Sequence, residues 1–145
     1  MKKMVIRNVM EEDYESVFRL LVQLFPGLSL VREEQKYAFQ NTLNAGNEYG
    51  LCAVNGDEIV GYCVYTTMNS YLYCGFVFYI TVLVVDKKYR RQGIGRALIE
   101  SVKQIAVEKG IKAIELDSGF HRTEAHLFYE NLGFEKECYF FSRGI

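Results

Sequence analysis

Residues 82–98 read VLVVDKKYRRQGIGRAL and contain, in order, an apolar strand, a short basic turn and an amphipathic helix. The four aliphatic residues 82–85 are typical of a strand that is buried on both faces. From Gly93 onward, apolar residues recur at helical spacing, and Gly110 supplies a stop signal. We therefore expect Gly93 and Gly95 to lie at the start of a helix.

This order of elements favours an anion site. The first N–H groups of a helix have no intrahelical partner, and the helix dipole adds partial positive charge there, so a phosphate is favoured. Glycines let the backbone approach a pyrophosphate, and Arg90, Arg91 and Arg96 add charge around the turn. Taken alone, the segment is equally compatible with a solvated turn whose glycines only cap a helix.

Length and composition predict a single globular domain over residues 1–145, half of them apolar and 24% charged. A net charge of −1 gives no indication of nucleic-acid binding, and the basic run at 87–91 suits a small anionic ligand better. The N-terminus does not resemble a signal peptide, and no stretch of about 18 apolar residues suggests a membrane span. We therefore expect a cytoplasmic protein.

The four cysteines, Cys52, Cys63, Cys74 and Cys138, form no CxxC pair, and the chain has two histidines. This pattern predicts no metal site and favours buried free thiols. Cys52 and Cys63 lie in strand-like runs, where a small apolar residue fits the core.

The remaining periodicity predicts a mixed α/β domain in which an antiparallel meander leads into one crossover unit. An Asn55-Gly56 dipeptide between two apolar runs is typical of a tight hairpin turn. Besides the helix that begins at Gly93, strands are expected at 4–9, 49–54, 59–67, 76–85, 113–117 and 134–141, and helices at 11–25, 31–43 and 123–132.

Two motifs together resemble the GNAT superfamily of N-acetyltransferases. The first is Arg90-x-x-Gly93-x-Gly95, and the second, AHLFYENLGF, spans residues 125–134 about 30 residues downstream. The resemblance covers nearly the whole chain. It implies a mixed, mostly antiparallel sheet flanked by about four helices, with acetyl-CoA as co-substrate and no metal.

The resemblance also implies roles for individual residues. Backbone groups of the strand segment Leu83, Val84 and Val85 would hold the pantetheine arm. The turn would wrap the pyrophosphate through Arg90, Arg91, Gln92, Gly93, Ile94, Gly95 and Arg96. Phe128 would flank the cofactor, and Tyr129 would lie beside the thioester sulfur. There a tyrosine hydroxyl can protonate the departing thiolate, so Tyr129 is the predicted general acid.

The general base departs from the family pattern. Many relatives carry a glutamate where this chain has Thr81, and threonine cannot serve as a base. Glu115, Asp117, His121 and Glu124 are possible substitutes, although structural roles suit Glu124 and His121 better. Orientation of an already neutral amine could also supply much of the rate without a base.

We therefore expect an N-acetyltransferase that acts on the primary amine of a small molecule, with a protein or peptide amine as an alternative acceptor. A non-catalytic acyl-CoA-binding sensor is a second alternative, motivated by Thr81. A dinucleotide-binding domain fits poorly, because a third glycine is absent and seven residues separate Val85 from Gly93. A homodimer is plausible, since a partner chain could complete the sheet edge beside the last strand.

Overall fold

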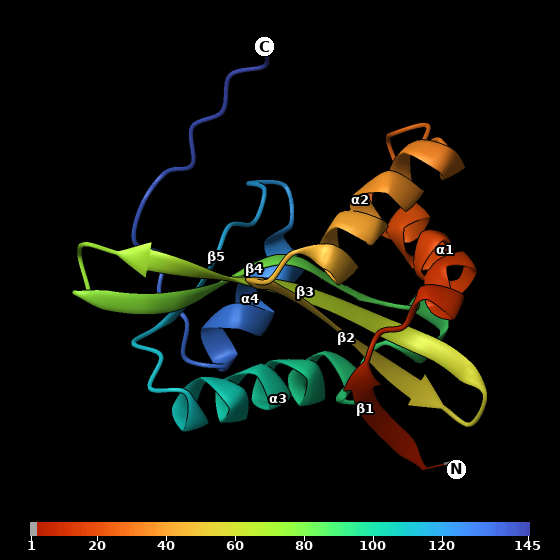
Figure 1. Cartoon of the computed structure of the whole chain (residues 1–145), viewed down its shortest axis with the longest axis horizontal. Coiled ribbons are helices and arrows are strands. Elements are labelled where there is room, and N and C mark those ends of the chain that lie inside the picture. The colour runs from red at the N-terminus through yellow and green to blue at the C-terminus, as the bar shows by residue number, and fades with distance from the viewer. Residues whose placement is uncertain (1–2) are drawn as a thin grey trace. The chain divides into compact units, whose positions relative to one another are not determined.

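The computed structural model describes residues 3–145 and divides after Glu115 into two compact units. No helix within these residues is long and apolar enough to cross a membrane. The architecture is the mixed α/β fold that the sequence predicts (Figure 1). The strands are β1 (Met4–Asn8), β2 (Glu48–Asn55), β3 (Glu58–Ser70), β4 (Gly75–Val85) and β5 (Ile114–Leu116). The helices are α1 (Tyr14–Leu24), α2 (Arg32–Asn44), α3 (Ile94–Glu108) and α4 (Thr123–Asn131), with short 3₁₀ helices η1 (Glu11–Asp13) and η2 (Lys87–Tyr89).

The strands form one sheet in the order β1-β2-β3-β4-β5, and the pairs β1–β2, β2–β3 and β3–β4 are antiparallel. The predicted hairpin between β2 and β3 is confirmed, with Asn55 paired to Glu58 and Gly56 at φ +65°. A type of turn that needs positive φ accepts glycine at no steric cost. Strands that follow one another in the chain are therefore neighbours in the sheet, and β4 lies between β3 and β5.

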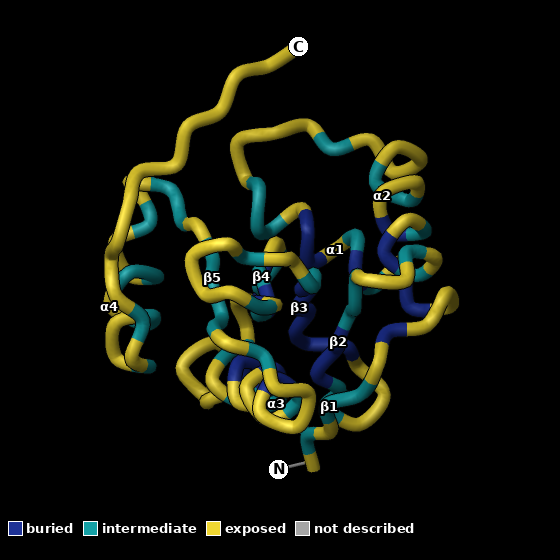
Figure 2. Tube along the Cα trace, turned by 60° about the vertical axis from the view of Figure 1, so that its left-hand side comes forward, coloured by how far each residue is buried: buried dark blue, intermediate teal, exposed yellow. Residues whose placement is uncertain are grey.

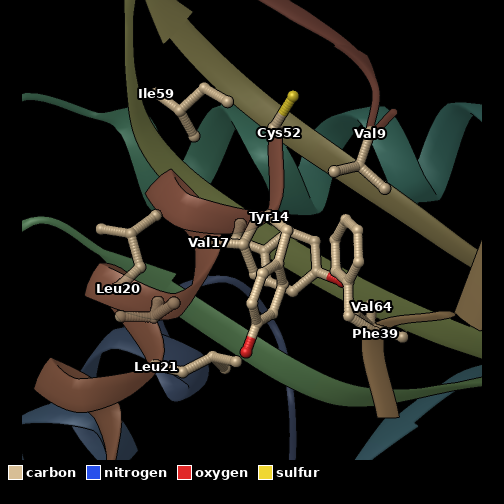
Figure 3. Packing of buried hydrophobic residues seen from close by; sticks show 11 residues of the cluster. Val9, Tyr14, Val17, Leu20, Leu21, Phe39, Cys52, Ile59 and Val64 are labelled. Atoms are coloured by element: carbon tan, nitrogen blue, oxygen red, sulfur yellow. The ribbon is translucent and has the colours of Figure 1, made fainter. Parts of the chain in front are cut away.

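Helices cover both faces of the sheet in the first unit. Helices α1 and α2 lie on one face and α3 lies on the other (Figures 1 and 2). On the first face, Tyr14 and Phe39 pack with ring centroids 5.2 Å apart (Figure 3). The Tyr14 hydroxyl donates to the Arg32 carbonyl at 2.5 Å. This cluster of buried side chains contains Val9, Tyr14, Val17, Leu20, Leu21, Phe39, Cys52, Ile59, Tyr62, Val64 and Val84. Helix α3 buries Ile94, Leu98, Ile99, Val102 and Ala106.

The cysteines divide into two classes. Cys52 and Cys63 are fully buried, and burial raises the pKa of their thiols to about 11 and about 12. The prediction of core thiols is confirmed for these two. It is wrong for Cys74 and Cys138, which are exposed. Within residues 3–145, no group of three or more His, Cys, Asp and Glu side chains gathers closely enough to hold a metal ion.

The second unit holds α4 and a C-terminal segment without regular structure. The strand predicted at 134–141 is not formed, and that prediction is wrong. Aromatic residues favour a strand but do not make one without a hydrogen-bonded neighbour. Among the described residues, the segment 135–145 finds no such backbone partner. Tyr139 and Phe141 are accordingly 72% and 89% exposed. The homodimer prediction rested on this strand and therefore loses its structural premise.

Candidate functional site

The basic turn follows β4 directly, as the sequence predicts. Strand β4 ends at Val85, η2 occupies the turn, and α3 begins at Ile94 after Gly93. The N–H of Ala97 donates to the Gly93 carbonyl at 2.9 Å and forms the first hydrogen bond of the helix. The N–H groups of residues 94–96 therefore lie at the open end of α3, where they can donate to an anion.

Two residues of the turn have a left-handed backbone, Arg91 at φ +64° and Gly93 at φ +81°. Nothing lies within 4 Å of the position that a Cβ of Gly93 would occupy. The requirement for glycine at this position therefore comes from the backbone torsion and not from packing. This backbone torsion of Gly93 determines the direction in which the chain enters α3.

Replacement of Gly93 by alanine is expected to lower the free energy of unfolding by about 1–2 kcal/mol, because a Cβ is disfavoured at positive φ. Chemical denaturation measures this change. Gly46→Ala is the matched control, since Gly46 also has open space around it but no positive φ. Equal stabilities of the two variants would contradict the role assigned to the Gly93 backbone.

The basic side chains of the turn are accessible. Arg90, Arg91, Gln92 and Arg96 are exposed. The Nε of Arg90 donates to the Val85 carbonyl at 3.1 Å, so this side chain folds back toward the end of β4. The structure thus brings the predicted residues from 90 to 96 together around one helix end, as their closeness in sequence requires.

The predicted residues of β4 differ in exposure. Val84 is 4% exposed and belongs to the core cluster, whereas Leu83 and Val85 are half-buried. Because the side chain of Val84 is buried, only its backbone groups can contact a ligand. At the start of β4, the Phe78 N–H donates to the Ala113 carbonyl at 3.0 Å, next to the first residue of β5. Because β5 has three residues and β4 has eleven, the end of β4 extends past β5.

A bulge interrupts β4 at Thr81. Val82 lies opposite Val64 and Ile80 opposite Tyr65, so Thr81 is the extra residue between them. Its hydroxyl donates to the Val64 carbonyl at 3.5 Å, and the residue is exposed. Bulges occur often next to active sites, because they redirect side chains and backbone groups. The bulge therefore lies at the position where the resemblance places a general base, although the Thr81 side chain cannot act as a base.

The four proposed substitutes for the base have different surroundings. Glu115 is half-buried and ends the first unit, whereas Asp117, His121 and Glu124 are exposed in the second. Glu124 lies in the first turn of α4, where a carboxylate stabilises the helix dipole. This placement agrees with the structural role that suits Glu124, and the identity of a base among the four stays a prediction.

The second motif forms a compact end to α4. The ring of Tyr129 packs against Phe128 and Phe134, with centroids 5.3 Å and 5.7 Å apart. The Phe134 N–H donates to the Tyr129 carbonyl at 3.0 Å, and Gly133 reverses the chain at φ +93°. These contacts hold the Tyr129 ring in place within the second unit. Its role at a thioester stays a prediction, as does that of Phe128.

Asp86 is a residue of the site that sequence patterns did not single out, because it lies between the apolar strand and the basic turn. Asp86 is fully buried, and its carboxylate accepts hydrogen bonds from Arg19 at 2.5 Å and from the Lys88 N–H at 3.1 Å. Burial raises the pKa of Asp86, but the bonds from Arg19, Lys88 and Gln23 together hold it below its ordinary value. An acidic residue directly after an apolar run is a visible signal, but nothing in the sequence connects it with Arg19.

Comparison with known proteins identifies the family. Residues 14–134 match the model described as the Acetyltransferase (GNAT) family. The chain belongs to this family. The matched range includes both motifs on which the resemblance rested, the turn after β4 and the segment 125–134.

Similar proteins extend this finding. An uncharacterized N-acetyltransferase of Methanocaldococcus jannaschii is 29% identical over 141 residues, which cover 94% of this chain and 62% of that protein. An aminoglycoside acetyltransferase from an uncultured soil sample, solved with sisomicin, has a TM-score of 0.82 at 25% identity over 98% of this chain and 96% of its own. The aminoglycoside N-acetyltransferase AAC(6')-Iy, solved with CoA, has a TM-score of 0.86 at 22% identity over 99% and 96% of the two chains, and shows likeness of fold. Among the curated relatives it matches, this GNAT chain spans between 16% and 65% of their length.

Proposed function

We propose that this GNAT protein transfers the acetyl group of acetyl-CoA to a primary amine of a small molecule. The observation that carries the proposal is the sequence of bulge, strand end, basic turn and helix start along residues 81–97. Free N–H groups at the start of α3, a glycine cap and exposed arginines suit a pyrophosphate. We further propose that residues 1–145 act as one acetyltransferase domain.

In this proposal, acetyl-CoA binds along the end of β4 and the turn. Backbone groups of Leu83–Val85 hold the pantetheine arm, because backbone donors and acceptors at the end of a strand can pair with its amides. The residues from Arg90 to Arg96 surround the pyrophosphate, and Phe128 flanks the cofactor. This assignment uses the half-buried positions of Leu83 and Val85 and the exposure of the arginines.

The reaction is a direct transfer in a ternary complex. The nitrogen of a neutral amine attacks the thioester carbonyl carbon, a C–N bond forms, and the C–S bond then breaks. The hydroxyl of Tyr129 gives its proton to the departing thiolate and regains one from solvent, while the amine loses a proton to water or a nearby carboxylate. The products are the acetylated amine and CoA with a free thiol. Because Thr81 cannot accept the proton, orientation of an amine that arrives neutral supplies much of the rate.

A non-catalytic acyl-CoA sensor is the second candidate, and Thr81 at the bulge is the observation that favours it. A thiol-release assay with polyamines, aminoglycosides, aminoalkylphosphonates, amino acids and peptides separates the possibilities. We expect release of free CoA with at least one small amine. Release of CoA with peptides alone would indicate that the acceptor is a protein or peptide amine. Binding of acetyl-CoA without release by any amine would favour the sensor.

A further inference from the structure

We propose that Arg19 and Gln23 of α1 act through Asp86 as positioning residues for the phosphate-binding turn. The inference rests on the proposed function, because it concerns the affinity of the same turn for CoA. It assigns to α1, a helix on the opposite face of the sheet from α3, a part in cofactor binding (Figure 1). None of these three side chains needs to contact CoA.

The first step concerns the Asp86 carboxylate, which is 1% exposed. A buried carboxylate is costly unless its oxygens are filled by donors. Arg19 donates to one oxygen at 2.5 Å, and Gln23 and the Lys88 N–H donate to the other at 3.4 Å and 3.1 Å. The charge is therefore retained in the interior by donors from α1 and from the turn itself.

The second step is that both α1 side chains also bind backbone. The Arg19 guanidinium donates to the Ile59 carbonyl of β3 at 3.0 Å. The Gln23 carboxamide oxygen accepts the Lys87 N–H at 2.9 Å. The Asp86 N–H in turn donates to the Val60 carbonyl at 2.8 Å. The start of the turn is thereby attached to α1 and to β3 at the same time.

A third step extends the attachment along the turn. The Tyr89 N–H donates to the Asp86 carbonyl at 2.8 Å, and the Tyr89 hydroxyl donates to Glu58 at the start of β3, also at 2.8 Å. Arg91, Gln92 and Gly93 come next and are exposed, and none of the hydrogen bonds to α1 and β3 given above involves them. The turn therefore has an anchored half, residues 86–90, and an exposed half, residues 91–93. The anchored half determines where the exposed half and the start of α3 lie.

This arrangement predicts a specific effect on binding. Preorganised donors bind an anion tightly because no ordering is needed when the ligand arrives. Asp86→Asn removes the negative charge and one of the two oxygens that accept from Arg19, Gln23 and the Lys88 N–H, so CoA itself must order part of the turn. Substitutions within a coupling network typically change binding by about 0.5–2 kcal/mol. We expect Asp86→Asn to weaken CoA binding by roughly 2- to 30-fold.

The chain offers a matched control in Asp13, which is 8% exposed and pairs with Arg7 at 2.8 Å. Both aspartates are buried carboxylates held by one arginine, but Asp13 joins β1 to η1 and has no bond to the turn. Asp13→Asn and Asp86→Asn should both lower stability. Only Asp86→Asn should change CoA affinity. Arg19→Lys, which keeps the charge on the more exposed partner, should give a smaller loss of affinity than Asp86→Asn.

The experiment is isothermal titration of wild type and variants with CoA and with pantetheine, which lacks the pyrophosphate, at a temperature where circular dichroism shows each variant folded. The inference predicts weaker CoA binding for Asp86→Asn, unchanged binding for Asp13→Asn and no Asp86 effect on pantetheine. If Asp86→Asn does not fold, Gln23→Ala replaces it and should weaken CoA binding in the same selective way. The inference would be overturned if Asp86→Asn, or Gln23→Ala in its place, bound CoA as tightly as wild type does. It would also be overturned if Asp13→Asn lost as much CoA affinity as Asp86→Asn. Failure of wild type to bind CoA would instead reject the proposed function.

Discussion

Tyr129→Phe is expected to lower the rate of acetyl transfer by about 10²- to 10⁴-fold, the range typical for loss of a general acid. The substitution removes the hydroxyl and keeps the ring, so the contacts with Phe128 and Phe134 at 5.3 Å and 5.7 Å persist. Without a proton donor, the thiolate leaves as an anion, and breakdown of the tetrahedral intermediate slows. Because the step lost is chemical, kcat should fall while the affinity for acetyl-CoA stays at the wild-type level.

Steady-state thiol release with the best amine of the panel measures this effect. Tyr139→Phe is the matched control, since Tyr139 is 72% exposed in the same unit and also loses only a hydroxyl. Its kcat should equal that of wild type. A Tyr129→Phe variant with wild-type kcat would remove Tyr129 from the catalytic machinery. A parallel fall in kcat and in thermal stability would point to a structural role.

Gly95→Phe is expected to weaken binding of CoA by about 100-fold. A bulky side chain in the first turn of α3 keeps the pyrophosphate away from the backbone N–H groups, and hydrogen bonds to charged groups are worth about 1.5–3 kcal/mol each. Loss of about two such bonds amounts to at least ~3 kcal/mol, or two orders of magnitude in affinity. The domain should remain folded, because glycine inside a helix is less favourable than most residues by about 0.5–1 kcal/mol.

Titration calorimetry with CoA and chemical denaturation together test this prediction. Lys103→Phe, an exposed substitution further along the same helix, is the control for a new aromatic side chain on α3. It should leave CoA affinity unchanged. An unchanged affinity in Gly95→Phe would remove Gly95 from the phosphate site, and unfolding of this variant would mean that the glycine is needed for packing.

Local patterns predicted most of the first unit. The apolar run before the turn, the place of Gly93 at the start of a helix and the Asn55-Gly56 hairpin are encoded by neighbouring residues, so each could be predicted before the structure. The structure confirms these features with boundaries that shift by up to three residues. The two family motifs extended the prediction to the fold, because their joint occurrence is more specific than either alone.

Features that depend on distant partners could not be predicted in the same way. Asp86 reads as a strand end, and its burial depends on Arg19, which lies 67 residues away. The residues 134–141 have the composition of a strand, but a strand needs a neighbour, and the described chain provides none for residues 135–145. Cysteine is a residue type that is usually buried, but Cys74 and Cys138 are exposed, and the local sequence does not show which segments the fold buries. Sequence patterns thus specify local conformation better than tertiary contacts.

The central claim, that the turn after β4 binds the pyrophosphate of acetyl-CoA, is tested most directly by isothermal titration of the purified protein with acetyl-CoA. The result expected is saturable binding of one acetyl-CoA per chain that weakens as salt concentration rises, because exposed arginines contribute to the site. If the folded protein shows no binding at any concentration of acetyl-CoA, the result would contradict the claim that this turn binds the pyrophosphate.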